Sequence, residues 1–214
     1  MEKIDIKNWP RRAQYENFVG YTNPIFSVTV RLDVTKLVKF CKENGKSFFV
    51  TFLYIMSESM NEIPEWRMRI KDDEVVIFDK VHPSFVVLKD DDELATCMSE
   101  AISDYETFHD KTKEMIAKAK SEKSGAFESV KRVDRIFVST LQWIDFTSMS
   151  NPYNFADKEQ TSIPRVTWGK YVLKGERYEM AFDVAGHHAL VDGVHSARLI
   201  SKIQGKIDDI ENLK

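Results

Sequence analysis

The pattern of hydrophobic and polar residues in the first half of the chain predicts helices flanked by strands. A β-rich run covers residues 25–32, and shorter β-prone runs follow near residues 67–70, 75–78 and 85–88. A polar turn at residues 71–74 separates the first two of these short runs. The pattern therefore predicts that the first third of the chain mixes helices and strands.

Two helices are predicted between the first strand and the short runs. Asp33 stands at the expected N-cap of an amphipathic helix, and Gly45 stands where that helix should stop. Its apolar face is formed by Val34, Leu37, Val38 and Cys41. Ser47 then caps a second helix that runs to about residue 60 and is apolar nearly all round, so we expect it to be buried.

A third amphipathic helix is predicted near the middle of the chain. Its apolar positions are Tyr105, Phe108, Thr112, Met115, Ile116 and Ala119. A stretch rich in serine, lysine and glycine follows at residues 120–125, which favours a loop.

The second half of the chain predicts the centre of the sheet and a closing helix. Apolar runs at residues 135–144, 166–173 and 178–188 read as three central strands, with a turn at residues 174–176. A C-terminal helix carries Ile200, Ile203, Ile207 and Ile210 on the face that packs on the sheet. Without a regular βαβ alternation, this order predicts an α+β two-layer sandwich, a mixed β-sheet packed against helices, as a single domain over residues 1–214.

Charge and composition exclude several classes of partner. The 31 lysine and arginine residues nearly balance the 34 aspartate and glutamate residues, so we expect no nucleic acid and no anionic membrane surface as a partner. The longest apolar run, residues 48–56, is too short to span a bilayer, and the first residues lack the order of a signal peptide. Two isolated cysteines suit a reducing compartment, so we expect a cytoplasmic protein.

The segment Gly-His-His-Ala-Leu-Val-Asp-Gly at residues 186–193 is the strongest chemical signal. His188 shares a strand face with Phe182 and Val184, whereas His187 points the other way, so only one histidine can serve a given cleft. A neutral imidazole, with an ordinary pKa of about 6.5, can take a proton from a hydroxyl group, and we take His188 as the candidate general base. Asp192 could organise the loop around it or pair with an arginine.

Two other interpretations of this segment remain open on the motif alone. Both histidines could be satisfied polar groups at a strand end, with Asp192 and Gly193 as a turn and a helix cap. A metal centre is disfavoured because His187, His188 and His195 lack a fourth ligand at a recognised zinc spacing, so we expect no metal.

Five ordered blocks widen the argument from one motif to the whole chain. They are NWPRR at residues 8–12, EWRMRIKDDE at 65–74 with VHP at 81–83, WIDFTS at 143–148, TWGKY at 167–171 and HALVDG at 188–193. Through them the sequence resembles the chloramphenicol acetyltransferase family over nearly its whole length. The resemblance implies a homotrimer with active sites at the subunit interfaces. It also implies acetyl transfer from acetyl-CoA, as co-substrate, to a hydroxyl of chloramphenicol, which inactivates this antibiotic without a covalent acyl-enzyme.

The resemblance also assigns the residues that carry the chemistry. His188 matches the family's general base, and Ser148 matches the serine whose hydroxyl stabilises the tetrahedral oxyanion. Arg11 matches the arginine that pairs with the motif aspartate, here Asp192, and so supports the histidine loop.

Four further positions are carried over for binding. Phe18 and Phe26 match aromatic residues of the acceptor pocket, Thr167 matches a threonine that holds a water near the transition state, and Tyr171 matches a tyrosine along the CoA channel. The family often has a tyrosine where Phe18 stands, and residues 90–135 match poorly. Acceptor specificity can therefore differ while the chemistry stays the same.

Three alternative functions compete with this one. The same machinery could serve a different small hydroxyl or thiol acceptor, because the H-x-x-x-D-G arrangement also occurs in dihydrolipoamide and plant-type acyltransferases. A serine hydrolase would need Ser148 as nucleophile, but no G-x-S-x-G elbow surrounds it. A non-catalytic binding protein would not require His188, Ser148, Asp192 and Arg11 together.

Overall fold

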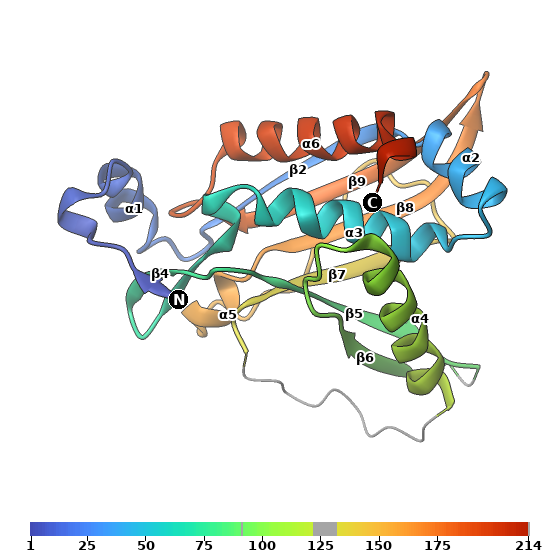
Figure 1. Cartoon of the computed structure of the whole chain (residues 1–214). Coiled ribbons are helices and arrows are strands. Elements are labelled where there is room, and N and C mark those ends of the chain that lie inside the picture. Colours follow the sequence, from blue (N-terminus) through green and yellow to red (C-terminus); the bar gives the residue numbers. More distant parts are fainter. Residues whose placement is uncertain (91, 122–131, 214) are drawn as a thin grey trace.

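The protein is built on a mixed six-stranded β-sheet (Figure 1). The computed structural model describes residues 1–90, 92–121 and 132–213. In spatial order the strands are β2 (Ile25–Asp33), β9 (Arg177–His187), β8 (Arg165–Lys174), β7 (Arg135–Leu141), β5 (His82–Leu88) and β6 (Leu94–Met98). The β5–β7 and β7–β8 pairs are parallel and the others antiparallel. The predicted mixed sheet, with the last three long strands at its centre, is confirmed.

Four helices pack on one face of this sheet (Figure 1). They are α2 (Thr35–Glu43), α3 (Phe48–Asn61), α4 (Tyr105–Ser121) and α6 (Gly193–Asp208). Helix α3 lies between α4 and α6 and contacts both, which explains why its sequence is apolar nearly all round. The predicted two-layer α+β arrangement is therefore present.

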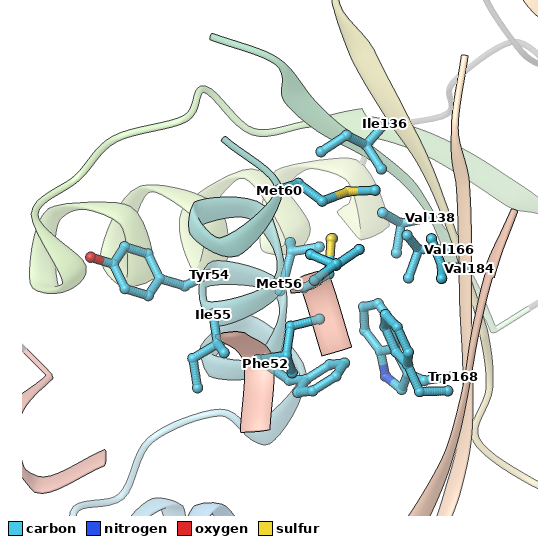
Figure 2. Packing of buried hydrophobic residues seen from close by; sticks show 14 of the residues in the cluster. Phe52, Tyr54, Ile55, Met56, Met60, Ile136, Val138, Val166, Trp168 and Val184 are labelled. Carbon is cyan, nitrogen blue, oxygen red and sulfur yellow. The ribbon is translucent and has the colours of Figure 1, made fainter. Parts of the chain in front are cut away.

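The main core lies between α3 and the central strands (Figure 2). Phe52 is fully buried and meets Trp168 edge to face, with ring centroids 4.9 Å apart. Met56 and Met60, one and two turns farther along α3, point at the same strands (Figure 2). Burial of these side chains is the main driving force that fixes the helix layer on the sheet.

Alternate side chains of the central strands point away from the helices. They lie on the face of the sheet that these helices do not cover, which we call the open face. Val138 and Val166 face the core, so their neighbours Ser139 and Thr167 face the other way. By the same alternation, Phe182 faces the core and Asp183 the open face. The open face is thus lined by polar side chains at the centre of the sheet.

A smaller sheet and several short elements complete the fold. The sheet has the order β1 (Glu2–Lys3), β4 (Glu74–Ile77) and β3 (Met68–Lys71). The short helices are η1 (Ile6–Asn8), α1 (Arg12–Phe18), η2 (Pro64–Arg67), α5 (Lys158–Thr161) and η3 (Ile210–Asn212). Strand β6 and helix α1 were not predicted from the sequence.

Element boundaries differ from the predictions at several places. Val34, not Asp33, occupies the N-cap of α2, although the Asp33 carboxylate still accepts the Thr35 N–H at 3.0 Å. Strand β7 ends at Leu141 because the chain turns there, with the Ile144 N–H bonded to the Leu141 carbonyl at 2.9 Å. The first two residues of the predicted loop 120–125 belong to α4, and the rest lie outside the described residues.

Ile210 is buried as predicted but belongs to η3 rather than to α6. Among the described residues, none of the helices combines the length and apolar character that a membrane span requires. Cys41 and Cys97 are both free and buried.

Candidate active site

His188 lies one residue beyond the end of β9 and is held at both its backbone and its ring. Its N–H donates to the Pro24 carbonyl at 2.7 Å, and its Nδ1 lies 3.1 Å from the Val191 carbonyl oxygen. A carbonyl oxygen can only accept, so Nδ1 must carry the proton in this hydrogen bond. The neutral ring then presents an unprotonated Nε2, which is the form a general base requires.

Two aromatic rings fix the plane of the His188 imidazole. Phe18 stacks on it with centroids 4.0 Å apart and planes 18° apart, and Phe26 stacks at 5.1 Å and 27°. Phe26 pairs with Gly186 in the sheet register, and a Cβ at Gly186 would collide with Val191 and Trp66 on the helix side. His188 is therefore positioned at the helix-covered side of the sheet end.

Arg11 and Asp192 form the ion pair expected beside the histidine. Arg11 Nη1 lies 2.8 Å from Asp192 Oδ2, across 181 residues of sequence. Burial acts to raise the pKa of Asp192, but the hydrogen bond from Arg11 and the charges of His195 and Arg11 outweigh it and hold this pKa below its ordinary value. Asp192 Oδ1 also accepts the Val194 N–H at 3.1 Å, so the same carboxylate caps α6.

The sequence patterns did not predict that His195 supports Asp192 and that Glu65 in turn contacts His195. His195 is almost fully buried and its Nδ1 accepts the Asp192 N–H at 3.1 Å, which completes a capping box. Its Nε2 lies 3.4 Å from Glu65 Oε1, and its carbonyl accepts the Trp66 indole N–H at 3.2 Å. The spacing Asp-x-x-His at a helix start was the available signal, but capping boxes usually have Glu or Gln in the third position.

His187 is buried, unlike its neighbour. Burial and the nearby charge of His188 lower its pKa to about 4, so it is neutral at physiological pH. Its Nδ1 accepts the Ala189 N–H at 3.2 Å. His187 thus shapes the turn that carries His188.

Thr167 and Ser139 are neighbours on the open face. They are register partners on β8 and β7, and Asp183 pairs with Thr167 on the other side. The Thr167 hydroxyl is fully buried and has no hydrogen-bond partner among the described residues. An unpartnered buried hydroxyl suits a bound water or substrate group, and the role of Thr167 in holding a water stays a prediction.

Tyr171 borders a cavity on the helix side of β8. The cavity has a volume of about 370 Å³ and is also lined by Phe48, Phe49, Thr140, Gln142, Trp168, Gly169 and Lys170. The Tyr171 ring packs against Phe48 at 4.8 Å and Tyr178 at 5.6 Å. The mainly apolar wall with an adjacent lysine can accept an elongated molecule that has apolar and anionic parts.

Within residues 1–90, 92–121 and 132–213, no cluster of three or more His, Cys, Asp and Glu side chains could hold a metal ion.

Comparison with known proteins identifies the family. A family model described as chloramphenicol acetyltransferase matches residues 1–204. The chain belongs to the chloramphenicol acetyltransferase family. It is 34% identical over 207 residues to a chloramphenicol acetyltransferase of Proteus mirabilis, covering 96% of this chain and 94% of that relative. It is 33% identical over 205 residues to chloramphenicol acetyltransferase 3 of Escherichia coli, covering 94% of each.

A solved chloramphenicol acetyltransferase has the same fold, with a TM-score of 0.89 and 25% identity, covering 97% of this chain and all of that one. The resemblance inferred from the five sequence blocks is therefore confirmed for the family and the fold.

Ser148 immediately precedes Met149, Ser150 and Asn151, which line a cavity together with Asp183, the register partner of Thr167 on the open face. It is exposed in the loop after β7, and among the described residues no hydrogen bond joins it to His188 or Thr167. Its role as oxyanion donor stays a prediction. Ser139, nine positions earlier, is half-buried and lies directly beside Thr167.

Proposed function

We propose that this protein transfers the acetyl group of acetyl-CoA to a hydroxyl group of chloramphenicol, with His188 as the general base. The observation that carries the proposal is the hydrogen bond from His188 Nδ1 to the Val191 carbonyl, which leaves Nε2 free to take a proton. The family and its acetyltransferase relatives support acetyl transfer to chloramphenicol, and acetyl-CoA as the donor follows from the family resemblance.

The reaction proceeds in two steps without a covalent enzyme intermediate. His188 Nε2 takes the acceptor hydroxyl proton as the oxygen attacks the thioester carbonyl, forming a tetrahedral oxyanion. The C–S bond then breaks, and the departing CoA sulfur receives the proton from His188. The stacked Phe18 and Phe26 rings keep the imidazole oriented throughout.

Acetyl-CoA would enter along the Tyr171 cavity. Phe48 and Tyr171 form its aromatic wall and Lys170 is adjacent, which suits the apolar pantetheine arm and the phosphates of CoA. Acetyl-CoA is an intracellular metabolite, and the free buried cysteines fit the reducing cytoplasm predicted from the sequence.

The active form is a homotrimer in which each site lies between two subunits. His188 lies at the helix-covered side of the sheet end, whereas Thr167 and Ser139 are on the open face. A strand presents its alternate residues to opposite sides, so one subunit cannot turn both sets toward the same substrate. A closed ring of identical subunits brings the base of one copy to the hydroxyl groups of the next.

The test is release of free CoA thiol from acetyl-CoA by the purified protein, with and without chloramphenicol. Thiol release should depend on chloramphenicol, and His188→Ala should keep the fold and oligomeric state but lose at least about 10²-fold in rate. A folded wild-type protein that releases no thiol with chloramphenicol would contradict the proposal. Full activity of His188→Ala would contradict the assignment of the base.

A further inference from the structure

Two arginines on the open face of the sheet have no acidic partner among the described residues. Arg135 on β7 and Arg165 on β8 both lie over the Phe137 ring, with their Cζ atoms 4.5 and 5.2 Å from its centroid. The Nε of each is buried without a hydrogen-bond partner. The Arg165 guanidinium donates to the Pro152 carbonyl, which is neutral. Neither guanidinium therefore forms an ion pair among the described residues, although the charge of Asp134 acts on Arg135 and Arg165 also lies 3.9 Å from the centroid of the Tyr153 ring.

The surroundings make this arrangement costly without a ligand. Arg135 is only 8% exposed, and burial lowers the pKa of both arginines. The carboxylate nearest to Arg135 in sequence, Asp134, is already engaged by Arg132 in two hydrogen bonds of 2.9 Å. Buried charges in proteins are normally paired, and two cations over one ring also repel each other.

A cavity of about 350 Å³ opens between these arginines. The hydroxyl groups of Ser84, Thr96 and Ser139 border it, and none of its lining residues is acidic. Guanidinium forks and neutral donors around an apolar ring form a setting suited to a carboxylate or phosphate on a small aromatic or aliphatic body.

We propose that Arg135 and Arg165 bind an oxoanion in this cavity. Ser139 borders the cavity and pairs with Thr167, so the bound molecule reaches the predicted site of acetyl transfer. The ligand class is then a hydroxyl acceptor that carries a carboxylate or phosphate group, in addition to chloramphenicol. This identification of the ligand as an acceptor rests on the proposed function, whereas the anion site itself does not.

The first test compares two probes of the same shape, 4-(hydroxymethyl)benzoate and 4-(hydroxymethyl)benzamide, by calorimetry. Only the first carries a negative charge, so the wild-type protein should bind it at least about tenfold more tightly. Equal affinity for the two probes would overturn the proposal without any variant.

Variants then locate the charge preference. Arg135→Gln and Arg165→Gln should each remove most of it, and Arg165→Lys should keep part, because lysine retains the charge but not the fork. Arg177→Gln is the matched control: it loses the same charge at an exposed position at the start of β9 and should leave the preference unchanged. Circular dichroism checks that each variant is folded.

Sedimentation of the same variants tests whether the two arginines instead contact an acidic side chain of a neighbouring copy of the chain. If both glutamine variants lose the oligomer while the benzoate preference persists, the arginines contact an acidic side chain of a neighbouring copy, and the proposal is wrong.

Acetyl transfer to the two probes distinguishes binding of an anion in the cavity from use of the bound molecule as an acetyl acceptor. A KM at least about tenfold lower for the benzoate than for the benzamide supports the acceptor assignment. Benzoate binding without its acetylation, in a protein that acetylates chloramphenicol, would overturn that assignment and leave the anion site standing. If chloramphenicol is not acetylated either, the proposed function fails, while the calorimetry still decides the anion site.

Discussion

At the scale of single residues, adjacent positions in this protein have very different chemistry. His187, the last residue of β9, is buried, whereas His188, one residue farther along the chain, is half-exposed. Strand alternation predicted that they point in opposite directions, and the stacking of His188 on Phe26 agrees with it. The hydrogen bond that sets the His188 tautomer could not be predicted, because it depends on how the turn to Val191 folds.

The oxyanion donor can be decided by a matched pair of serine variants. Ser139→Ala should lower kcat by about 10² to 10³-fold if the hydroxyl beside Thr167 is the donor, and Ser148→Ala should then have little effect. Steady-state kinetics with chloramphenicol measures both. A large loss in Ser148→Ala with Ser139→Ala near wild type would instead support Ser148 as the donor, as the sequence blocks predict.

At the scale of elements, the loop after β7 is held by close contact with β8. A Cβ added at Gly169 would lie 2.7 Å from the Ile144 carbonyl oxygen and 3.1 Å from the Phe146 ring. The same carbonyl accepts the Lys170 N–H at 2.9 Å. Only a residue without a side chain allows this approach, so Gly169 fixes the position of the loop that carries Ser148.

Gly169→Ala should therefore lower the free energy of unfolding by about 1–3 kcal/mol, since the loop backbone must move outward. Gly20→Ala is the matched control, because nothing lies within 4 Å of an added Cβ there, and it should change stability by less than about 0.5 kcal/mol. Urea unfolding at one fixed protein concentration measures both. Equal stability of the two variants would contradict the close contact.

The sequence predicted the long elements well because their patterns are strong. The Ser47 cap, the all-round apolar α3 and the three central strands follow directly from periodicity. Strand β6 was missed because an acidic run, residues 90–93, precedes only five alternating residues. Helix α1 has seven residues and no side-chain cap, so no start signal marks it.

At the scale of the whole molecule, the proposed function places each site between two subunits. The Arg11–Asp192 pair holds the base on one side of the sheet end, and Thr167 with Ser139 presents hydroxyl groups on the other. Contacts between residues far apart in sequence came from the family resemblance, since periodicity says nothing about them. The separation of the two half-sites required the fold itself, because it follows from which face each strand residue occupies.

The most direct test of this account is complementation between two inactive subunits. One carries His188→Ala, and the other carries Ser139→Ala with Thr167→Val. Hybrid trimers, isolated with two affinity tags after co-expression, contain one interface at which an intact base meets intact hydroxyl groups, so activity should return to about one third of the wild-type rate. Hybrids no more active than the two parent proteins would contradict a site shared between subunits.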